Sequence, residues 1–252
     1  MTARPTRHLL VIGAQRCGST WVHDLLAAHP DIVMARPARP EPKVFLSAED
    51  SARGRDWYVG TYFAHARGEH VLGEKSTSYL EYAEAADRAA AMLGDPLVLA
   101  VLRDPVRRAR SHWAFSTDNG YEDRPLDEVL EQNLDGPLPW SPGRTSVSPY
   151  AYLERGRYTD YLGPWLERFG DDVTIAFLEE LTTEESARAR LMERLGVDPA
   201  HAVPPEGAVN TSTHPAPEID EALVARLRGY FRDSDTALRE LVGRPLPWPT
   251  AE

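Results

Sequence analysis

Apolar residues in this chain gather in short runs, and each run is followed by a polar loop and then by residues with helical spacing. Uninterrupted runs of about five or six apolar residues are typical of parallel strands that are buried on both faces. Such runs predict strands at 8–12, 97–102 and 173–177, and a less apolar segment at 71–75 leads in the same way into a loop. Strands that alternate with helices predict an α/β fold of the P-loop-like, three-layer type, with a central parallel sheet flanked by helices.

The helices are predicted from apolar residues that recur every three or four positions and from residues that favour helix ends. Asp104 and Pro105 are a strong start signal, because aspartate caps the first N–H groups and proline fits the first turn. Gly94 is placed to end the helix before them. The predicted helices span 19–28, 56–65, 81–93, 105–116, 150–169, 183–195 and 218–242. Two proline-rich segments, 35–42 and 136–149, are predicted to be loops.

The composition bounds the class of protein. A chain of 252 residues with 42% hydrophobic residues can bury a large core, and we expect a single domain over residues 1–252. The formal net charge of -11 argues against a nucleic-acid partner, which would need a basic face. The single cysteine permits neither an intramolecular disulfide nor a cysteine-rich metal site. No apolar stretch approaches the roughly 20 residues of a membrane span and no signal-peptide pattern is present, so we expect a cytoplasmic protein without membrane insertion.

The first predicted strand leads into a segment with the spacing of a P-loop, G-x-x-x-x-G-K-S/T, from Gly13 to Thr20. Ser19 stands where the lysine of that motif should be, and the nearest cation is Arg16 inside the loop. Backbone N–H groups in such a turn, at the start of a helix, form a site for an anion. The segment therefore predicts phosphate binding without the lysine that NTP hydrolysis needs, and a turn that binds nothing is the alternative.

Basic residues follow the predicted strands more often than acidic ones: Arg16, Lys75 and Arg103 against Glu179. Because ligands bind at the carboxyl ends of parallel strands, this bias predicts an anion at that edge of the sheet. Arg103 stands at the start of a helix with Ser111 about two turns along it, and arginine with a hydroxyl is a good donor set for a phosphate. Three further arginines of this segment are expected to pair with surface acids: Arg107, Arg108 and Arg110.

Four segments between about residues 8 and 116 resemble motifs of the sulfotransferases that use PAPS (3'-phosphoadenosine 5'-phosphosulfate), and they occur in the order that the family has. Residues 13–20 resemble the 5'-phosphosulfate loop of that family, and residues 103–111 resemble its 3'-phosphate motif. Residues 40–45 resemble the K-E-P-x-F-F element of the carbohydrate-sulfating branch, and residues 74–79 resemble its E-K-S-x-x-Y element. Less specifically, residues 210–215 resemble the loop that closes over the donor in bacterial relatives.

The resemblance implies an enzyme that transfers a sulfuryl group from PAPS to a hydroxyl of a small-molecule, natural-product or sugar acceptor, without a metal and with 3',5'-ADP as product. It implies that Glu41 is the general base, that Lys75 faces the transferred group, and that Arg16 clamps the phosphosulfate during catalysis. The donor-binding residues that it implies are Gln15, Arg16, Cys17, Gly18, Ser19, Thr20, Arg103, Ser111, Thr211, Ser212, Thr213 and His214.

The sequence departs from the family pattern at two positions. Arg16 stands where many relatives have a lysine, and arginine keeps the charge but cannot donate a proton to a leaving oxygen. Pro40 stands where the K-E-P element has lysine, and Lys43 is the candidate to replace that charge. Another branch of the family uses a histidine base, and His70 and His112 are the candidates by position, so the identity of the base stays open between them and the glutamate.

Two other functions stay open from the sequence: a small-molecule kinase that uses ATP and magnesium, and a nucleotide-binding module without catalysis. Aromatic residues near the proline-rich loops are expected to be mainly core, with stacking on an acceptor ring as the alternative: Trp57, Tyr58, Tyr62, Phe63, Trp140, Tyr150, Tyr152 and Tyr158.

Overall fold

The computed structural model describes residues 6–141, 143, 145–206 and 212–251. Contacts within the chain divide it into two compact units. The first unit comprises Met1–Leu102 and Tyr161–Val209, and the second comprises Arg103–Asp160 and Asn210–Glu252. The expectation of a single domain stays a prediction.

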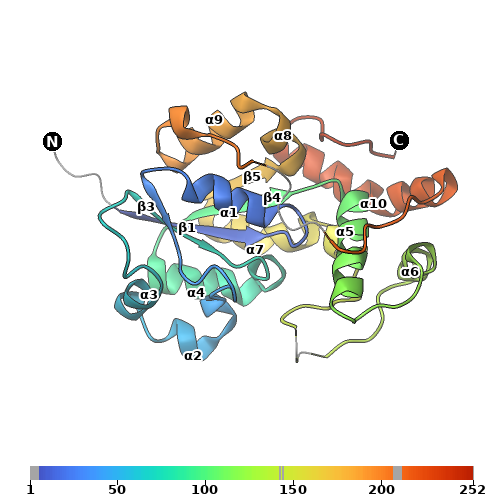
Figure 1. Ribbon diagram of the computed structural model, residues 1–252, viewed down its shortest axis with the longest axis horizontal. Coiled ribbons are helices and arrows are strands. Elements are labelled where there is room, and N and C mark those ends of the chain that lie inside the picture. Colours follow the sequence, from blue (N-terminus) through green and yellow to red (C-terminus); the bar gives the residue numbers. More distant parts are fainter. Residues whose placement is uncertain (1–5, 142, 144, 207–211, 252) are drawn as a thin grey trace. The chain divides into compact units, whose positions relative to one another are not determined.

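The first unit is built on a five-stranded sheet in which every described pair of neighbouring strands is parallel. The strands are β1 (Arg7–Gly13), β2 (Ile32–Met34), β3 (Val71–Lys75), β4 (Leu97–Leu102) and β5 (Val173–Phe177). Figure 1 labels all of them except β2. They lie in the order β2-β3-β1-β4-β5. The parallel sheet was predicted, whereas β2 was not, because three residues are too few to show a periodic pattern.

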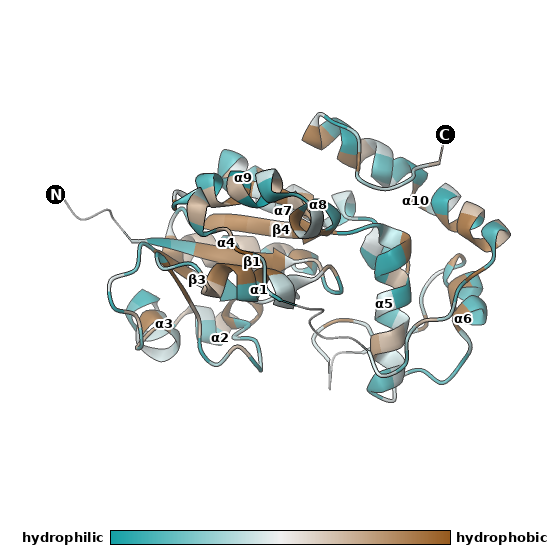
Figure 2. Cartoon of the chain, turned by 45° about the horizontal axis from the view of Figure 1, so that its top comes forward, coloured by the Kyte–Doolittle hydropathy of each residue, from teal (hydrophilic) through white to brown (hydrophobic). Residues whose placement is uncertain are grey.

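Helices lie on both sides of this sheet, and Figure 1 shows α9 on one side and α4 on the other. Leu9 and Val11 of β1 pack in one cluster with Leu25 of α1 and Leu191 of α9. Figure 2 shows why the layers form: the strands are brown along most of their length, whereas the helices carry both teal and brown residues. Strands that are apolar on both faces need a helical layer on each side, so the predicted three-layer α/β fold is confirmed.

In the first unit α1, α4 and α9 have ends close to those expected from the sequence, α3 ends three residues earlier than expected, and α2 and α8 were not predicted. Their bounds are α1 (Ser19–Ala27), α2 (Ala48–Ser51), α3 (Arg55–Tyr62), α4 (Ala83–Leu93), α8 (Leu178–Thr183) and α9 (Glu185–Leu195). Single 3-10 turns lie at Val44–Leu46, Tyr79–Glu81, Gly170–Asp172 and Pro199–His201.

The second unit is helical, with α5 (Pro105–Asp118), α6 (Leu126–Asn133), a 3-10 turn at Glu154–Gly156 and α10 (Glu221–Val242), while α7 (Thr159–Phe169) starts in it and continues into the first unit. Its core is one cluster of buried side chains, to which Val106, Val129, Tyr152, Leu227 and Phe231 belong. No described helix is long and apolar enough to cross a membrane.

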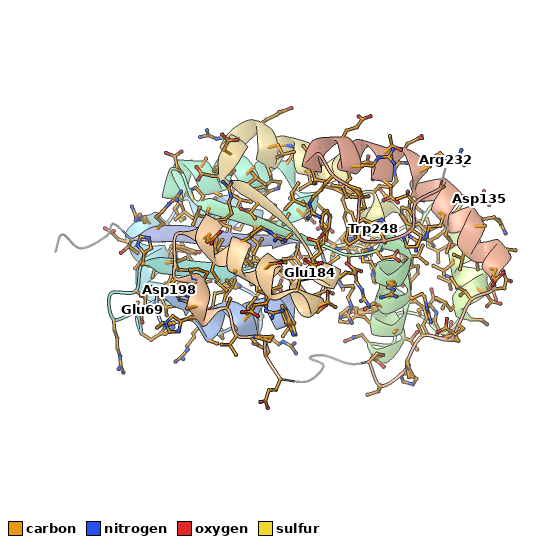
Figure 3. All side chains as sticks on the ribbon, turned by 90° about the horizontal axis from the view of Figure 1, so that it is seen from above. Glu69, Asp135, Glu184, Asp198, Arg232 and Trp248 are labelled. Carbon is orange, nitrogen blue, oxygen red and sulfur yellow. The ribbon has the colours of Figure 1, made fainter. Side chains whose placement is uncertain are left out.

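The C-terminal segment of the second unit is held on α10 by Trp248, which is labelled in Figure 3. Its indole Nε1–H donates to Asp235 Oδ2 at 3.3 Å. The pKa of Asp235 is raised to about 6, because the effect of burial exceeds the opposing effect of the hydrogen bond from Trp248.

The prediction of one helix over residues 150–169 was wrong, because α7 begins only at Thr159. Before it the chain turns through Glu154–Gly156, and a Cβ on Gly156 would stand 2.9 Å from the Phe231 ring and 3.0 Å from Pro105 Cβ. Tertiary packing of this backbone therefore overrides the helical pattern.

Four of the aromatic residues singled out in the sequence are core residues: Tyr58, Phe63, Tyr152 and Tyr158.

Candidate active site

The loop between β1 and α1 has the geometry of an anion site. Gly18 caps α1 with a φ of 73° in the left-handed region, and a Cβ at this position would overlap the Leu178 side chain. Arg16 also has a positive φ of 68°, which is uncommon for a residue other than glycine. The loop begins with Ala14, whose N–H donates to the Val101 carbonyl at 2.7 Å. The first N–H groups of α1, which lack intrahelical acceptors, therefore follow a tight turn that carries a cation.

The side chains of this loop differ in what they can offer to a ligand. Arg16, Ser19 and Thr20 are partly exposed. Gln15 donates from Nε2 to Ser78 Oγ at 3.2 Å, so it links the loop to the segment after β3. Cys17 is fully buried, and a contact between Cys17 and a donor would therefore have to come from its backbone.

Glu41 and Lys75 form a nearly buried ion pair at the carboxyl end of β3. Lys75 is the last residue of the strand, and its Nζ lies 2.6 Å from Glu41 Oε1. The two side chains are only 7% and 15% exposed. Thr77 donates to Glu41 Oε2 from its backbone N–H at 3.1 Å and from Oγ1 at 3.2 Å. The carboxylate is therefore held by three donor groups, although it belongs to a proline-rich loop.

The same segment after β3 packs against the start of the anion loop. Thr77 O lies 3.4 Å from the place where a Cβ on Gly13 would stand, and Leu80 Cβ lies 2.8 Å from it. Ser76 donates its backbone N–H to the Val11 carbonyl at 3.1 Å. The first unit thus brings together the anion loop and the Glu41–Lys75 pair, which the sequence placed in separate motifs.

Lys43 takes part in the site through its backbone. It has a positive φ of 54°, and its N–H donates to Ser76 Oγ at 2.9 Å. The side chain is partly exposed. Its role as the replacement for a lysine at Pro40 stays a prediction.

The two histidines considered as alternative bases are poorly placed for that role. His70 precedes Val71, the first residue of β3, and so belongs to the edge of the sheet opposite to Lys75. His112 is only 1% exposed, and its ring centroid lies 4.8 Å from that of Tyr152 inside the second unit. Within the first unit, Glu41 pairs with Lys75 at the carboxyl edge of the sheet, whereas His70 lies at the opposite edge.

In the second unit, hydrogen bonds from Tyr158 and Arg228 hold Arg103 and Asp104, respectively. Arg103 follows the last residue of β4, and its carbonyl accepts a hydrogen bond from the Tyr158 hydroxyl at 2.6 Å. Asp104 caps α5 by accepting from the Val106 N–H at 2.9 Å, as predicted, and it accepts two bonds from Arg228 at 2.8 and 2.7 Å. Arg103 and Ser111, the predicted 3'-phosphate residues, are both partly exposed.

The other arginines of α5 follow the expectation only in part. Arg107 and Arg110 lie within ion-pair distance of acidic side chains, at 4.0 and 2.8 Å respectively. The expectation was wrong for Arg108, which is fully buried and donates to the carbonyl of Tyr152. Its position on the inner face of α5 takes it away from the surface and gives it a backbone acceptor in the core.

Three of the residues expected near the donor surround one carboxylate. Ser212 Oγ and Thr213 Oγ1 each lie 2.5 Å from Asp118, and His214 Nδ1 lies 2.6 Å from it. These bonds hold the pKa of Asp118 well below its usual range. The sequence analysis missed Asp118, because nothing local connects the end of α5 with a loop so much later in the chain. Thr211 lies outside the described residues.

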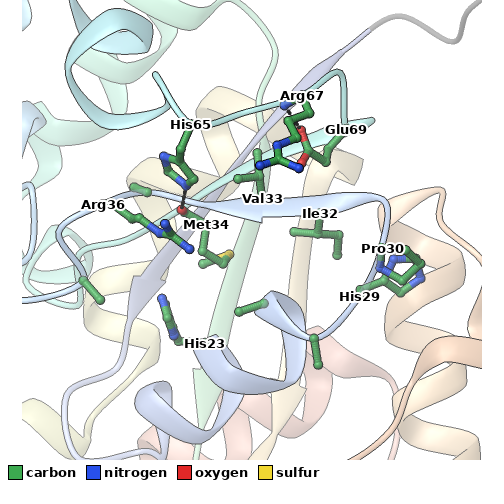
Figure 4. A pocket seen from close by; sticks show the side chains of 14 residues that line it. His23, His29, Pro30, Ile32, Val33, Met34, Arg36, His65, Arg67 and Glu69 are labelled. Atoms are coloured by element: carbon green, nitrogen blue, oxygen red, sulfur yellow. Dashed lines mark hydrogen bonds between the residues drawn. The ribbon is translucent and has the colours of Figure 1, made fainter.

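A cavity of about 530 Å³ lies along β2, one of the two edge strands of the sheet (Figure 4). Ala35, Arg36 and Ala38, which line it, belong to the loop that carries Glu41. His65, also in the lining, has Nε2 at 3.1 Å from the carbonyl of Met34, as the dashed line in Figure 4 shows. Among the residues that the structure describes, no group of three or more histidine, cysteine or acidic side chains is arranged to hold a metal ion.

Comparisons with known proteins identify the family of the chain. Residues 6–179 match the family model described as "Sulfotransferase domain". The bifunctional heparan sulfate N-deacetylase/N-sulfotransferase 1 of Caenorhabditis briggsae is 29% identical over 165 residues, which are 64% of this chain and 19% of that protein. The human heparan sulfate glucosamine 3-O-sulfotransferase 3B1 is 24% identical over 262 residues, which are 95% of this chain and 64% of that protein. The chain thus spans less than two thirds of the length of these relatives.

Among solved structures, the sulfotransferase from Alicyclobacillus acidocaldarius superposes with a TM-score of 0.73 and 24% identity, covering 97% of this chain and 98% of that one. A sulfotransferase domain from the curacin biosynthetic pathway superposes with a TM-score of 0.51 and 14% identity, covering 98% of this chain and 100% of that one. These structures share the fold, and the family match covers more than half of the chain. The protein therefore belongs to the sulfotransferase domain family.

Proposed function

We propose that this protein transfers a sulfuryl group from PAPS to a hydroxyl of a small-molecule, natural-product or sugar acceptor. The observation that carries the proposal is the buried Glu41–Lys75 pair, held by Thr77 beside the anion loop. The acceptor oxygen forms a new S–O bond, its proton passes to the Glu41 carboxylate, and the S–O bond to the 5'-phosphate breaks. The products are a sulfate ester and 3',5'-ADP.

The residues present suit the donor. Backbone N–H groups at the start of α1, the Arg16 guanidinium and the hydroxyls of Ser19 and Thr20 are the donor types that bind phosphate and sulfate oxygens. The donor supplies an activated sulfuryl group, and the task of this loop is to orient it and stabilise charge on its oxygens. Arg103, with Ser111, is assigned to the 3'-phosphate on the family resemblance.

Lys75 is suited to bind both the base, Glu41, and the sulfuryl group that is transferred. An ammonium group has three N–H donors, and Glu41 accepts one of them. The remaining donors are available for sulfuryl oxygens, while the bond to Glu41 and the two bonds from Thr77 hold the base in one orientation. Stabilising charge on the moving group is the electrostatic role that such transfers require.

We assign the acceptor to the β2 side of the sheet. The anion loop follows β1, Lys75 ends β3, and β2 is the next strand beyond β3. An acceptor that meets Glu41 from the side away from the anion loop would enter along the cavity at β2, which shares three lining residues with the Glu41 loop. The net charge of -11 favours a neutral small molecule or simple sugar over the heparan sulfate chains for which the relatives are named.

The test has two steps. Thermal unfolding is measured with 3',5'-ADP and, separately, with ATP and magnesium, since a ligand at 100 times its Kd stabilises by about 2.7 kcal/mol. Labelled donor is then supplied with a panel of hydroxyl acceptors, and mass spectrometry detects the gain of one sulfate. Stabilisation by ATP and magnesium alone would favour a kinase, although Ser19 at the lysine position speaks against it. Stabilisation by 3',5'-ADP without transfer to any acceptor would favour a nucleotide-binding module.

A further inference from the structure

A fully buried carboxylate lies one residue before Lys75 and takes no part in the chemistry proposed above. Glu74 is 0% exposed. Its Oε2 accepts from the Tyr58 hydroxyl at 2.5 Å, and its Oε1 accepts from Ser76 Oγ and from the Tyr79 hydroxyl, both at 2.6 Å. Burial raises the pKa of Glu74, and these three hydrogen bonds oppose that shift. A buried carboxylate is costly even when it is satisfied, so its presence beside the site calls for a reason.

Two of the three hydroxyls connect Glu74 to the loop that carries Glu41. Ser76 Oγ accepts the backbone N–H of Lys43 at 2.9 Å, and the Tyr79 oxygen accepts the backbone N–H of Phe45 at 3.2 Å. A hydroxyl has a single proton, and both hydroxyls give it to Glu74. Their oxygens therefore face the loop as acceptors, in the orientation that its N–H groups need.

The loop needs such support because little regular structure holds it. Glu41 stands between Pro40 and Pro42, neither of which can donate a backbone hydrogen bond. Lys43 has a φ of 54°, a conformation that costs free energy for a residue other than glycine. The bond from its N–H to Ser76 stabilises this conformation two residues after Glu41.

We propose that Glu74 is a positioning residue for the sulfuryl transfer, which acts through Ser76 and Tyr79 to hold the Glu41 loop against Lys75. This inference rests on the proposed function, in which Glu41 is the base. It explains why these residue types occur together in the segment 74–79. Glu74, Ser76 and Tyr79 build the support, and Lys75 faces the reacting groups. The hydroxyls that donate to Glu74 belong to Tyr58, Ser76 and Tyr79 and not to the anion loop, so we expect donor binding to change little when this support is removed.

Tyr58 and Tyr79 form a matched pair for the test. Both are fully buried, both donate to Glu74, and their ring centroids lie 5.9 and 5.4 Å from that of Phe45. They differ in one respect: the Tyr79 oxygen accepts a backbone N–H of the loop, whereas the hydrogen bond described for the Tyr58 hydroxyl goes to Glu74. Tyr58→Phe and Tyr79→Phe therefore remove the same kind of bond to the same carboxylate, and only the second also releases the loop.

The variants are compared by kcat, by the Kd of 3',5'-ADP and by melting temperature. Tyr79→Phe is expected to lower kcat about 10- to 100-fold with the Kd unchanged, because misplacing a reacting group by about 1 Å has effects of that size. Ser76→Ala is expected to act in the same direction. Tyr58→Phe is expected to keep kcat within about twofold while losing a comparable amount of stability. Glu74→Gln keeps an oxygen for Ser76 and Tyr79, so it should retain most of the activity that Glu74→Leu loses.

A second measurement reads the loop without activity. Hydrogen exchange at the Lys43 and Phe45 amides should be faster in Tyr79→Phe than in Tyr58→Phe. Equal exchange and equal kcat in the two tyrosine variants would overturn the positioning role and leave Glu74 a structural residue. If the wild-type protein sulfated no acceptor, the proposed function would fail, while the exchange difference would still show whether Glu74 holds the loop.

Discussion

Replacing Glu41 by glutamine tests the assignment of the base with little change in shape. In the structure the carboxylate accepts from Lys75 Nζ at 2.6 Å and from Thr77 N at 3.1 Å, so an amide with one oxygen can keep only part of this arrangement. The amide cannot take the proton of the acceptor hydroxyl. Since general-base catalysis contributes about 100- to 10,000-fold, kcat of Glu41→Gln should fall by that factor.

The loss of stability should be much smaller than the loss of activity. A charge-assisted hydrogen bond is worth about 1.5–3 kcal/mol against about 1 kcal/mol for a neutral one. The amide oxygen still accepts one neutral bond, so we expect the free energy of unfolding to fall by about 1–2 kcal/mol. That is small beside the roughly 5–15 kcal/mol that keep a domain folded, so unfolding cannot account for a loss of activity of the predicted size.

The assay is single-turnover sulfation with labelled donor, together with calorimetric binding of 3',5'-ADP. Donor-product binding should be unchanged, because Glu41 is not part of the loop at 13–20. Thr77→Val is the control: it removes the Oγ1 donor but leaves the backbone bond and the Lys75 pair, so kcat should fall by no more than about tenfold. Near-wild-type turnover of Glu41→Gln with intact 3',5'-ADP binding would refute the assignment.

Three further predictions address other parts of the chain. Gly18→Ala places a Cβ against Leu178 at a φ of 73° and should cost about 1–3 kcal/mol of unfolding free energy in denaturant titrations; an unchanged midpoint would contradict the loop geometry. Arg103→Ala should weaken 3',5'-ADP binding by about 1.5–3 kcal/mol and 5'-AMP binding much less in calorimetry, and equal losses would contradict its assignment to the 3'-phosphate. The pKa of Asp235 rises from 3.8 to about 6 on folding, so its contribution to stability is complete below pH 3.8 and is lost as the pH rises through 6. Asp235→Asn, which keeps an acceptor for Trp248, should remove up to about 3 kcal/mol of this pH dependence in thermal unfolding; an unchanged slope would show that another group titrates.

Much of the fold could be predicted because its signals are local. The strands β3, β4 and β5 have the predicted bounds, and Asp104 caps α5 as its position before Pro105 indicated. Apolar runs, caps and turn residues act within a few positions of the chain, so they can be recognised without knowing what packs where. The same holds for the anion loop, whose glycines answer a local need for a positive φ and for close approach.

The aromatic segment 150–158 shows where local signals mislead. Its spacing suits a helix, but Tyr152 and Tyr158 are buried by packing in the second unit, and the chain turns at Gly156 against Phe231. An apolar pattern records that side chains are buried and not which backbone conformation buries them. Long-range packing therefore decided this segment.

The sequence by itself determined the parallel α/β class, the anion loop and the separate motifs around Glu41 and Lys75. Only the tertiary structure decided that these two side chains form a buried pair and that Glu74 accepts hydrogen bonds from Ser76 and Tyr79. The same is true of Asp118 and its partners Ser212, Thr213 and His214. The bonds from Lys75 to Glu41, from Lys43 to Ser76 and from Thr213 to Asp118 each join positions more than 30 residues apart. A hydrogen bond across that separation forms only where folding brings its donor and acceptor within about 3 Å, and no pattern along the chain encodes that distance.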